Sequence, residues 1–242
     1  MAHRREVSRI EGFSDAVFAF AVTLLVVSLE VPRTFSDLLV VMRGFFAFAI
    51  CFAVLIGIWH EHFVFFRRYG FQDGATVWLN AALLFVVLFY VYPLKFVFSF
   101  LISMFSGQGA RVRLPNGTVE TMVENGDQVA TLMLIFGLGY AAVFGLFILL
   151  YWHAYRNRER LELNELEVFD TRTDIRESLL NVGIAVVSIL VALLGRGRFA
   201  GLSGMTYMLT PIVMTVHGMM TGKRRRKLEN ELGLGRPLLD AK

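Results

Sequence analysis

The chain has 242 residues and a formal net charge of +4, with 56% hydrophobic and only 18% charged residues and a mean hydropathy of +0.58. Phenylalanine alone contributes 23 residues. A soluble protein of this length would have too little polar surface to cover so many apolar side chains, so the composition excludes a soluble globular fold and predicts an all-α integral membrane protein.

Six apolar segments follow one another along the chain, and each is a predicted transmembrane helix. They are Phe13–Val31, Leu38–Phe66, Val77–Phe105, Val129–Trp152, Leu179–Leu194 and Phe199–Met220. Basic residues precede the first segment, as in a secretory signal, but no small-residue cleavage site follows it, so it is expected to be a span. The second and third segments exceed the ~20 residues that a span needs, and can tilt or project. The fifth is short and is expected to pack against the sixth across Gly195–Gly197.

The connections are expected to lie outside the bilayer, because unpaired backbone groups cannot face lipid. Glycines and a proline in the segment Ser106–Asp127 predict turns. The charged segment Tyr155–Arg176 is predicted to extend the fourth helix along the membrane surface. The chain is thus expected to form a single membrane domain, with an N-terminus at residues 1–12, a transmembrane region at 13–220 and a basic tail at 221–242.

Basic residues set the predicted orientation. Arginine and lysine concentrate in the N-terminus, the second and fourth connections and the C-terminal tail, which predicts a multi-pass cell-membrane protein with both termini in the cytoplasm. The run Lys223–Lys227 is first of all such a topology signal, and attraction to anionic lipid headgroups is the alternative. Binding of nucleic acid is not expected, because no aromatic or globular reader accompanies the run.

Polar residues gather near the cytoplasmic ends of the first three spans. Ser14 and Asp15 lie one turn into the first span, Trp59 and His62 lie near the end of the second, and Asn80 lies one turn into the third. All lie at one predicted level of the bilayer, where buried polar groups could satisfy one another. Independent roles are the alternative: a helix cap for Ser14 or Asp15, the aromatic belt for Trp59 and headgroup contact for His62.

The sequence gives little support for a metal site, an enzyme or a disulfide. His60 and His62 are two positions apart and point to nearly opposite sides of a helix, so one metal ion cannot easily reach both. No metal-ligand pair at helical spacing, nucleophile elbow or phosphate loop is found, so neither an enzyme nor a bound cofactor is expected. The single cysteine, Cys51, excludes a disulfide within the chain.

The segment from Arg9 to Val26 carries a family resemblance. Arg9-x-x-x-Phe13-Ser14-Asp15, followed by an apolar run, resembles the RxxxFSD signature of potassium channels of the transmembrane-protein-175 type. Trp59 and His62, and then Asn80, Phe85 and Pro93, are also similar to that family. The likeness is specific over residues 4–95 and weak afterwards, where only the number of spans agrees.

The resemblance implies a potassium-permeable channel in the lipid bilayer. Family members with one six-helix repeat per subunit form homotetramers, with the first helix of each subunit around the central pore. Within the first helix, Ala16, Phe20, Thr23 and Val27 fall within an arc of ~60° and could line such a pore. Phe20 occupies the position of the family's hydrophobic constriction, which is usually Ile or Leu. Thr23 keeps the family's hydroxyl, although it could instead bond to a carbonyl of its own helix.

Asp15 is expected to have a different role. It lies roughly a quarter turn from Thr23 around the helix, so it should face a neighbouring helix. There it could lock the pore helix against Arg9, His62 and Asn80.

The main alternative function is a proton-coupled or proton-conducting transporter. Coupled transporters usually keep ionisable groups near mid-membrane. Here Asp15, Glu61 and Lys95 lie toward the ends of the predicted spans, which favours a passive pore.

Overall fold

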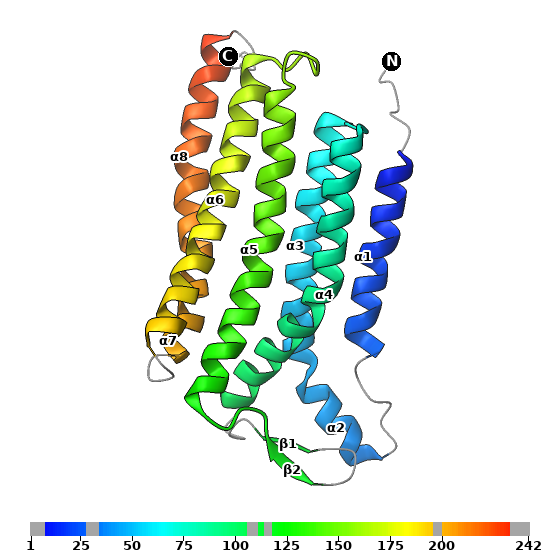
Figure 1. The fold of residues 1–242 in the computed structure, drawn as a ribbon, viewed down its shortest axis with the longest axis vertical. Coiled ribbons are helices and arrows are strands. Elements are labelled where there is room, and N and C mark those ends of the chain that lie inside the picture. The colour runs from blue at the N-terminus through cyan, green and yellow to red at the C-terminus, as the bar shows by residue number, and fades with distance from the viewer. Residues whose placement is uncertain (1–7, 28–33, 106–110, 114–117, 196–199, 233–242) are drawn as a thin grey trace, which may run out of the picture.

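The computed structural model describes residues 8–27, 34–105, 111–113, 118–195 and 200–232, which form a bundle of long helices (Figure 1). The elements in chain order are α1 (Arg9–Val27), α2 (Phe35–Arg43), α3 (Phe45–Tyr69), α4 (Gly74–Phe105), β1 (Arg111–Arg113), β2 (Val119–Thr121), α5 (Gly126–Arg156), α6 (Glu165–Leu194), α7 (Ala200–Met205), the 3-10 turn η1 (Thr206–Met208) and α8 (Leu209–Glu231). Four of the described helices, α3 to α6, are long and apolar enough to cross a membrane.

The bundle has two sides. Helix α1 packs against α3 and α4 on one side, α5 packs between α4 and α6, and α8 packs on α6 at the far side (Figure 1). The start of α1 and the end of α8 lie at the same end of the bundle. Large buried aromatic side chains fill the middle, among them Phe65, Tyr90, Phe147 and Tyr151. The aromatic residues that are so abundant in the sequence therefore form much of the core between helices.

The second predicted span is not one helix. It divides into α2 and α3 at Gly44, whose backbone N–H bonds to the carbonyl oxygen of Val41 at 3.0 Å, three residues back instead of four. Glycine is a poor helix former and permits such a local turn, whereas mean hydropathy cannot detect it. Helix α3 then ends at Gly70, which adopts the left-handed conformation (φ 54°) that commonly terminates helices.

Helix α4 is fixed at its start and bends in its second half. Asp73 precedes it, and its Oδ1 accepts bonds from the backbone N–H of Thr76 at 3.1 Å and from the hydroxyl of Thr76 at 2.6 Å. The Asp73 Oδ2 pairs with Nε2 of His153 on α5 at 2.8 Å. Pro93 lies inside the helix, where it removes a backbone donor, and Figure 1 shows the lower half of α4 leaning toward α5.

Helix α6 is longer than the predicted fifth span, Leu179–Leu194. Helix α5 ends at Arg156, and a new helix, α6, begins at Glu165, so the segment Tyr155–Arg176 does not extend the fourth helix. The side chain of Asn164 accepts from the N–H of Glu167, and the side chain of Glu167 accepts from the N–H of Asn164, both at 2.9 Å. This reciprocal cap starts α6 well before its apolar part.

The last predicted span is also interrupted. Helix α7 and the η1 turn precede α8, and Pro211 lies in the first turn of α8, where a missing donor is tolerated. Helix α8 continues past Met220 through Lys223–Lys227 to Glu231. Part of the segment Ser106–Asp127, predicted as turns, forms the antiparallel pair β1–β2. The Arg196–Gly197 part of the predicted turn, the end of the first predicted span after Val27 and the tail from residue 233 lie outside the described residues.

Candidate functional site

Helix α1 buries one stripe of side chains against α3 and α4. Ser14, Phe18, Ala21 and Leu25 are all between 0% and 4% exposed. Their spacing of four, three and four residues places them on one face of the helix. The side that faces the bundle is therefore well defined, and so is the side that faces away.

A buried chain of hydrogen bonds joins α1 to both neighbours. The Asn80 Nδ2 donates to the Ser14 Oγ at 2.9 Å, and this hydroxyl donates to the carbonyl oxygen of Ile10 at 2.8 Å. The Asn80 Oδ1 lies 2.9 Å from the His62 Nε2. Because an amide oxygen can only accept, the His62 Nε2 is the donor. The three residues are at most 3% exposed, so protein groups satisfy their hydrogen bonds in place of water.

Aromatic rings enclose the imidazole of His62. The Phe18 ring of α1 lies 5.5 Å from it and the Phe66 ring 4.5 Å, measured between ring centroids. The imidazole therefore has apolar neighbours on its faces and an amide at one nitrogen. This arrangement fixes its orientation.

Asp15 takes a different partner from the expected ones. Its Oδ1 accepts from the indole Nε1 of Trp59 at 2.8 Å, and the Trp59 ring stacks on Phe63 at 5.6 Å. Ser14, one position earlier, bonds to Asn80 in place of Asp15. The structure therefore brings Ser14, His62 and Asn80 together, whereas Asp15 bonds to Trp59. Consecutive helical residues point ~100° apart, which explains why the two neighbours meet different helices.

Arg9 and Phe13 stay outside this network. Both side chains are exposed, and Arg9 forms no hydrogen bond or ion pair with the described part of the chain. The start of α1 is fixed instead by a contact that the motif does not include. The Ser8 N–H bonds to Glu11 Oε2 at 3.1 Å, and the Glu11 N–H bonds to Ser8 Oγ at 3.2 Å. The spacing Ser8-x-x-Glu11 is a readable capping signal that the sequence analysis did not use.

The proposed pore-lining residues lie on the face of α1 that points away from the bundle. Ala16 and Thr23 are exposed, and Phe20 is 56% exposed. At 100° per residue this face lies roughly 160° from the buried stripe. The Thr23 Oγ1 donates to the carbonyl oxygen of Ala19 at 2.8 Å. The side chain of Val27 lies outside the described residues.

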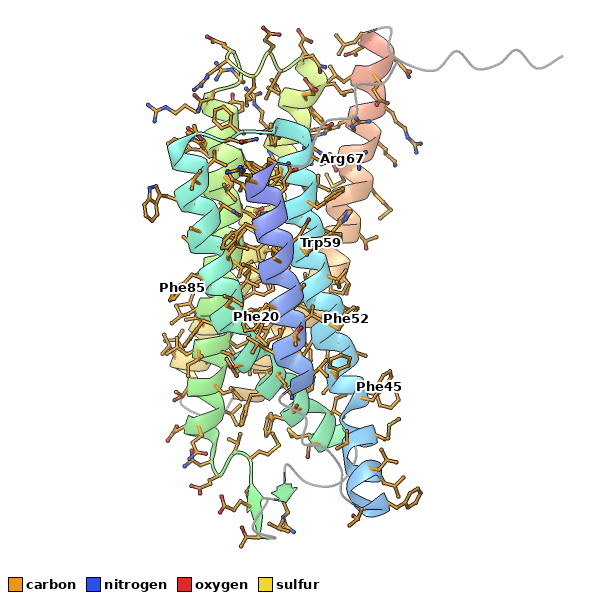
Figure 2. All side chains as sticks on the ribbon, turned by 90° about the vertical axis from the view of Figure 1, so that its right-hand side faces the viewer. Phe20, Phe45, Phe52, Trp59, Arg67 and Phe85 are labelled. Atoms are coloured by element: carbon orange, nitrogen blue, oxygen red, sulfur yellow. The ribbon has the colours of Figure 1, made fainter. Side chains whose placement is uncertain are left out.

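Aromatic side chains flank α1 on the same side of the molecule. Figure 2 shows Phe20 on the front of α1, with Phe45 and Phe52 of α3 on one side and Phe85 of α4 on the other. Phe85 is 71% exposed, Phe45 54% and Phe52 40%. Exposed apolar side chains of this kind, which also occur on α5, α6 and α8, are typical of a surface that contacts lipid or another protein chain.

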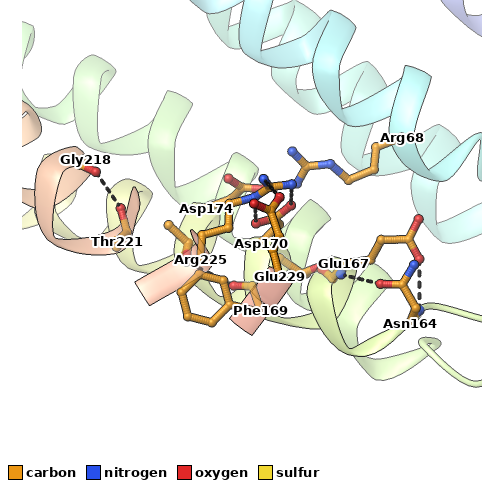
Figure 3. Close-up of polar contacts among 12 residues, drawn as sticks. Arg68, Asn164, Glu167, Phe169, Asp170, Asp174, Gly218, Thr221, Arg225 and Glu229 are labelled. Carbon is orange, nitrogen blue, oxygen red and sulfur yellow. Dashed lines mark hydrogen bonds and ion pairs between the residues drawn. The ribbon is translucent and has the colours of Figure 1, made fainter. Parts of the chain in front are cut away.

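A second polar cluster ties α3, α6 and α8 together, and the sequence analysis missed it. Arg68 pairs with Asp174 (Figure 3). The Tyr69 hydroxyl lies 2.7 Å from the Thr171 Oγ1. Arg225 of α8 binds Asp170 through two nitrogens, at 2.9 and 3.2 Å. Partners such as Arg68 and Asp174 are 106 residues apart, so no local pattern could have paired them. This cluster joins α3 to α6 and α8, and none of its residues belongs to α1.

Within the described residues, no group of three or more His, Cys, Asp or Glu side chains could hold a metal ion. Helix α1 is held by hydrogen bonds on one face, and it presents an apolar ring and a hydroxyl on the other. Such a face can restrict or contact an ion only if it lines an enclosed path.

Comparisons with known proteins add independent findings. The family model for the endosomal/lysosomal potassium channel TMEM175 matches residues 9–90. A potassium channel of Marivirga tractuosa is 42% identical over 232 residues, which cover 93% of this chain and 91% of the relative. A potassium channel of Chamaesiphon minutus is 35% identical over 105 residues, covering 40% of this chain and 52% of the relative. The similarity thus extends far beyond residue 95, where the sequence analysis had it weaken.

Two solved structures are similar as well. One is the crystal structure of a variant of the potassium channel MtTMEM175 in complex with a nanobody–MBP fusion protein, with a TM-score of 0.77 and 41% identity over 92% of this chain and 96% of that chain. The other is a lysosomal potassium-selective channel TMEM175 homologue from Chamaesiphon minutus, with a TM-score of 0.55 and 20% identity over 88% of this chain and 96% of that chain. At this lower identity, the second structure supports the fold alone.

Proposed function

Because the chain belongs to the family of the endosomal/lysosomal potassium channel TMEM175, we propose that it is a passive, potassium-permeable channel formed by four copies around a central axis. The observation that carries this proposal is the two-sided character of α1. One face is fastened to α3 and α4, and the opposite face, with Ala16, Phe20 and Thr23, is exposed. One helix cannot enclose a path, whereas four copies of this face can.

Phe20 and Thr23 then have separate roles in the pore. Four Phe20 rings converging on the axis form an apolar constriction, which excludes water and gives a partly dehydrated cation no oxygen ligand. One turn further from the cytoplasm, Thr23 adds a ring of hydroxyl groups. Its hydrogen is used in the bond to Ala19, which leaves the lone pairs of the hydroxyl oxygen for a cation. Ala16 and Val27 line the wider path before and after these two rings.

The exposed aromatic residues beside α1 support an assembly. If α1 lies at the axis, Phe45 and Phe52 of α3 on one side and Phe85 of α4 on the other flank the contact with the neighbouring subunits (Figure 2). In a membrane, exposed apolar side chains are already surrounded by apolar lipid, so burying them between subunits gives no hydrophobic gain. Close packing of these side chains is therefore a main source of association. Arg9, Asp15 and Trp59 lie close to the cytoplasmic end of that contact.

The proposed membrane arrangement has six crossings. They are α1, α3, α4, α5, α6 and the combined α7–α8 segment, with α2 and the β1–β2 hairpin at the outer end. An even number of crossings is supported by the start of α1 and the end of α8, which lie at one end of the bundle (Figure 1). The turn between α5 and α6, with Arg158 and Arg160, lies at the same end, which supports a cytoplasmic position for that end.

Potassium flux into liposomes that contain the purified protein tests this function. A potassium gradient alone should drive flux, and an imposed proton gradient should not move potassium uphill. Potassium accumulation that requires a proton gradient would replace the channel by a proton-coupled transporter. Mass measurement in detergent and in lipid tests the assembly separately, because a monomer or dimer would leave the exposed face of α1 without the copies that enclose a pore.

A further inference from the structure

Two hollows follow one another along the seam between α6 and α8, on the side of the bundle away from α1. The first is an apolar groove of about 630 Å³. Its lining includes Leu180, Gly183 and Val187 of α6 and Leu209, Val213 and His217 of α8. The second hollow, of about 570 Å³, lies at the cytoplasmic end and is lined by arginines of both helices. Arg176 lines both hollows, so they adjoin one another at this residue.

The sequence builds this feature as two matching stripes. On α6, positions 172, 176, 180, 183 and 187 recur every three or four residues, and on α8 positions 209, 213 and 217 do the same, with position 224 seven residues, or about two turns, further on. Gly183 keeps the groove open, because a Cβ built there would meet no atom within 4 Å. The groove is therefore a regular property of the helix faces, and a Cβ added at Gly183 would enter it without a clash.

The arginines at the cytoplasmic end are available to a ligand. Arg176 and Arg224 are exposed and form no ion pair or hydrogen bond with any described residue. Arg172 donates to the Tyr155 hydroxyl at 2.5 Å and lies over the Tyr155 ring. A tyrosine does not neutralise its charge. Three positive charges from two helices thus meet at the mouth of an apolar groove.

Acidic residues also line the cytoplasmic hollow, at its far end. They are Glu159, Glu162 and Glu165. Glu159 lies 3.7 Å from Arg158, which it can neutralise. Glu165 lies seven residues before Arg172, roughly 10 Å along the helix at 1.5 Å per residue. The end of the hollow next to the apolar groove is therefore the positive one.

The length of the groove matches one leaflet of a bilayer. From Arg176 to Val187 there are eleven residues, roughly 16 Å along α6. This is about half of the ~30 Å hydrocarbon core. A ligand with an anionic head at the arginines would thus have room for an acyl chain that reaches the middle of the membrane. A free anion would use only the head end of such a site.

We propose that the α6–α8 seam binds one anionic phospholipid per subunit. The phosphate group lies between Arg172, Arg176 and Arg224, and an acyl chain lies along Gly183 toward Val187. The exposure of this seam to lipid rests on the proposed function, because α8 faces the bilayer only if α1 lies at the axis. The site itself is built by α6 and α8 of one subunit and needs no residue of another.

Native mass spectrometry of the purified full chain tests the site, since it counts lipids and subunits in the same particle. The protein is titrated with phosphatidylglycerol, with phosphatidylcholine, or with phosphatidylglycerol plus millimolar inorganic phosphate. Three variants accompany the wild type: Arg176→Gln with Arg224→Gln, Gly183→Leu, and a matched control with Lys223→Gln and Arg226→Gln. The control removes two exposed positive charges from the same end of α8 without touching the groove.

The wild type should retain one phosphatidylglycerol per subunit in preference to phosphatidylcholine. The groove double variant should weaken retention of phosphatidylglycerol by about 30-fold, whereas the control should change it by less than about threefold. Gly183→Leu should reduce retention of both lipids, because it fills the acyl part. If both double variants weaken retention of phosphatidylglycerol equally, the lipid is held by diffuse attraction to the basic end of α8, and the proposed site is wrong. If inorganic phosphate displaces phosphatidylglycerol, the arginines form a site for free anions and not for a lipid.

Two further outcomes separate the lipid site from the proposed function. No preference for phosphatidylglycerol in an intact wild-type tetramer would overturn the lipid site and leave the channel assembly standing. A monomeric or dimeric particle that retains phosphatidylglycerol with the same variant pattern would overturn the assembly and support the site.

Discussion

Loss of the Asn80 side chain should loosen α1 more directly than any other single change. Its amide bonds both Ser14 of α1 and His62 of α3, and the residue is only 3% exposed. Asn80→Ala removes both bonds at once. Ser14 keeps its bond to the carbonyl oxygen of Ile10, so the main loss falls on His62, whose ring is 2% exposed and would have a buried N–H without an acceptor.

The size of the effect follows from these contacts. Hydrogen bonds between helices in membranes contribute ~0.6 kcal/mol on average, so two of them give about 1 kcal/mol. A buried donor that is left unpaired adds a cost of about 1–3 kcal/mol. We therefore expect Asn80→Ala to lower the free energy of unfolding by about 2–4 kcal/mol, with a clear fall in the melting temperature of the purified protein.

Asn181 provides a matched control in the other half of the bundle. It is 4% exposed, accepts from the Tyr140 hydroxyl at 2.6 Å and donates to the carbonyl oxygen of Glu177 at 3.1 Å. Asn181→Ala should lower thermal stability to a similar extent but leave potassium flux per folded protein unchanged, whereas Asn80→Ala should alter both. Equal effects of the two variants on flux, or wild-type stability of Asn80→Ala, would refute a specific role of the network in holding α1.

Three further predictions concern other positions. Phe20→Ala should raise basal potassium flux and loosen discrimination against larger cations. Thr23→Ala should mainly weaken the preference for potassium, measured by reversal potentials. If Phe20→Ala lowers stability but leaves conductance unaltered, the Phe20 ring lies outside the pore. Asp15→Ala should reduce the stability of the assembly in heated detergent more than ion selectivity, and Trp59→Phe should have the same effect because it removes the same bond. Burial raises the pKa of Asp73, but hydrogen bonds from Thr76 and His153 outweigh this effect, so the pKa of Asp73 is lowered in the folded protein. Asp73 should therefore stabilise the fold above about pH 4, and this stabilisation should disappear as the pH falls through its folded pKa. A difference in stability between the wild type and Asp73→Ala that does not shrink in acid would contradict this prediction.

The apolar parts of the long helices could be predicted from the sequence because hydropathy records how much apolar surface a segment carries. The breaks could not be predicted in the same way. Arg43 and Gly44 interrupt a run that is otherwise apolar, and mean hydropathy averages over such a short interruption; α6 begins in a charged stretch that hydropathy assigns to a connection. The capping pair Asn164 and Glu167 was visible in the sequence, and it would have placed the start of α6 correctly.

The sequence placed Ser14, Asp15, Trp59, His62 and Asn80 at one level of the bundle, but it did not predict which of them meet, and Arg9 and Phe13, which were expected in the same network, lie outside it. The motif contains Ser14 and Asp15 side by side, and their partners depend on how α1 is rotated against α3 and α4. A rotation of ~100° exchanges the directions of neighbouring residues, and sequence periodicity alone does not fix it here, because several faces of α1 are apolar. Pairing across the bundle, as between Arg68 and Asp174, depends on tertiary packing in the same way.

The structure fixes this rotation at two points of α1. Near one end Ser14 accepts from Asn80, and near the other the Lys95 Nζ donates to the carbonyl oxygen of Leu25 at 3.3 Å. Ser14 and Leu25 are eleven residues apart, roughly 16 Å, and almost on the same face of the helix. Both partners belong to α4. A helix held at one point can roll about that point, but a helix held at two points on one face cannot roll without breaking a bond.

Phe20 lies midway between these two attachments, on the opposite face. Its direction is therefore set by contacts that it does not itself make. If Phe20 forms the constriction, then the polar residues of α1 and α4 determine its aperture by fixing the rotation of α1, although none of them lies on the proposed axis. The buried amide of Asn80 and the ammonium of Lys95 are then as much determinants of conduction as the ring that stands in the path.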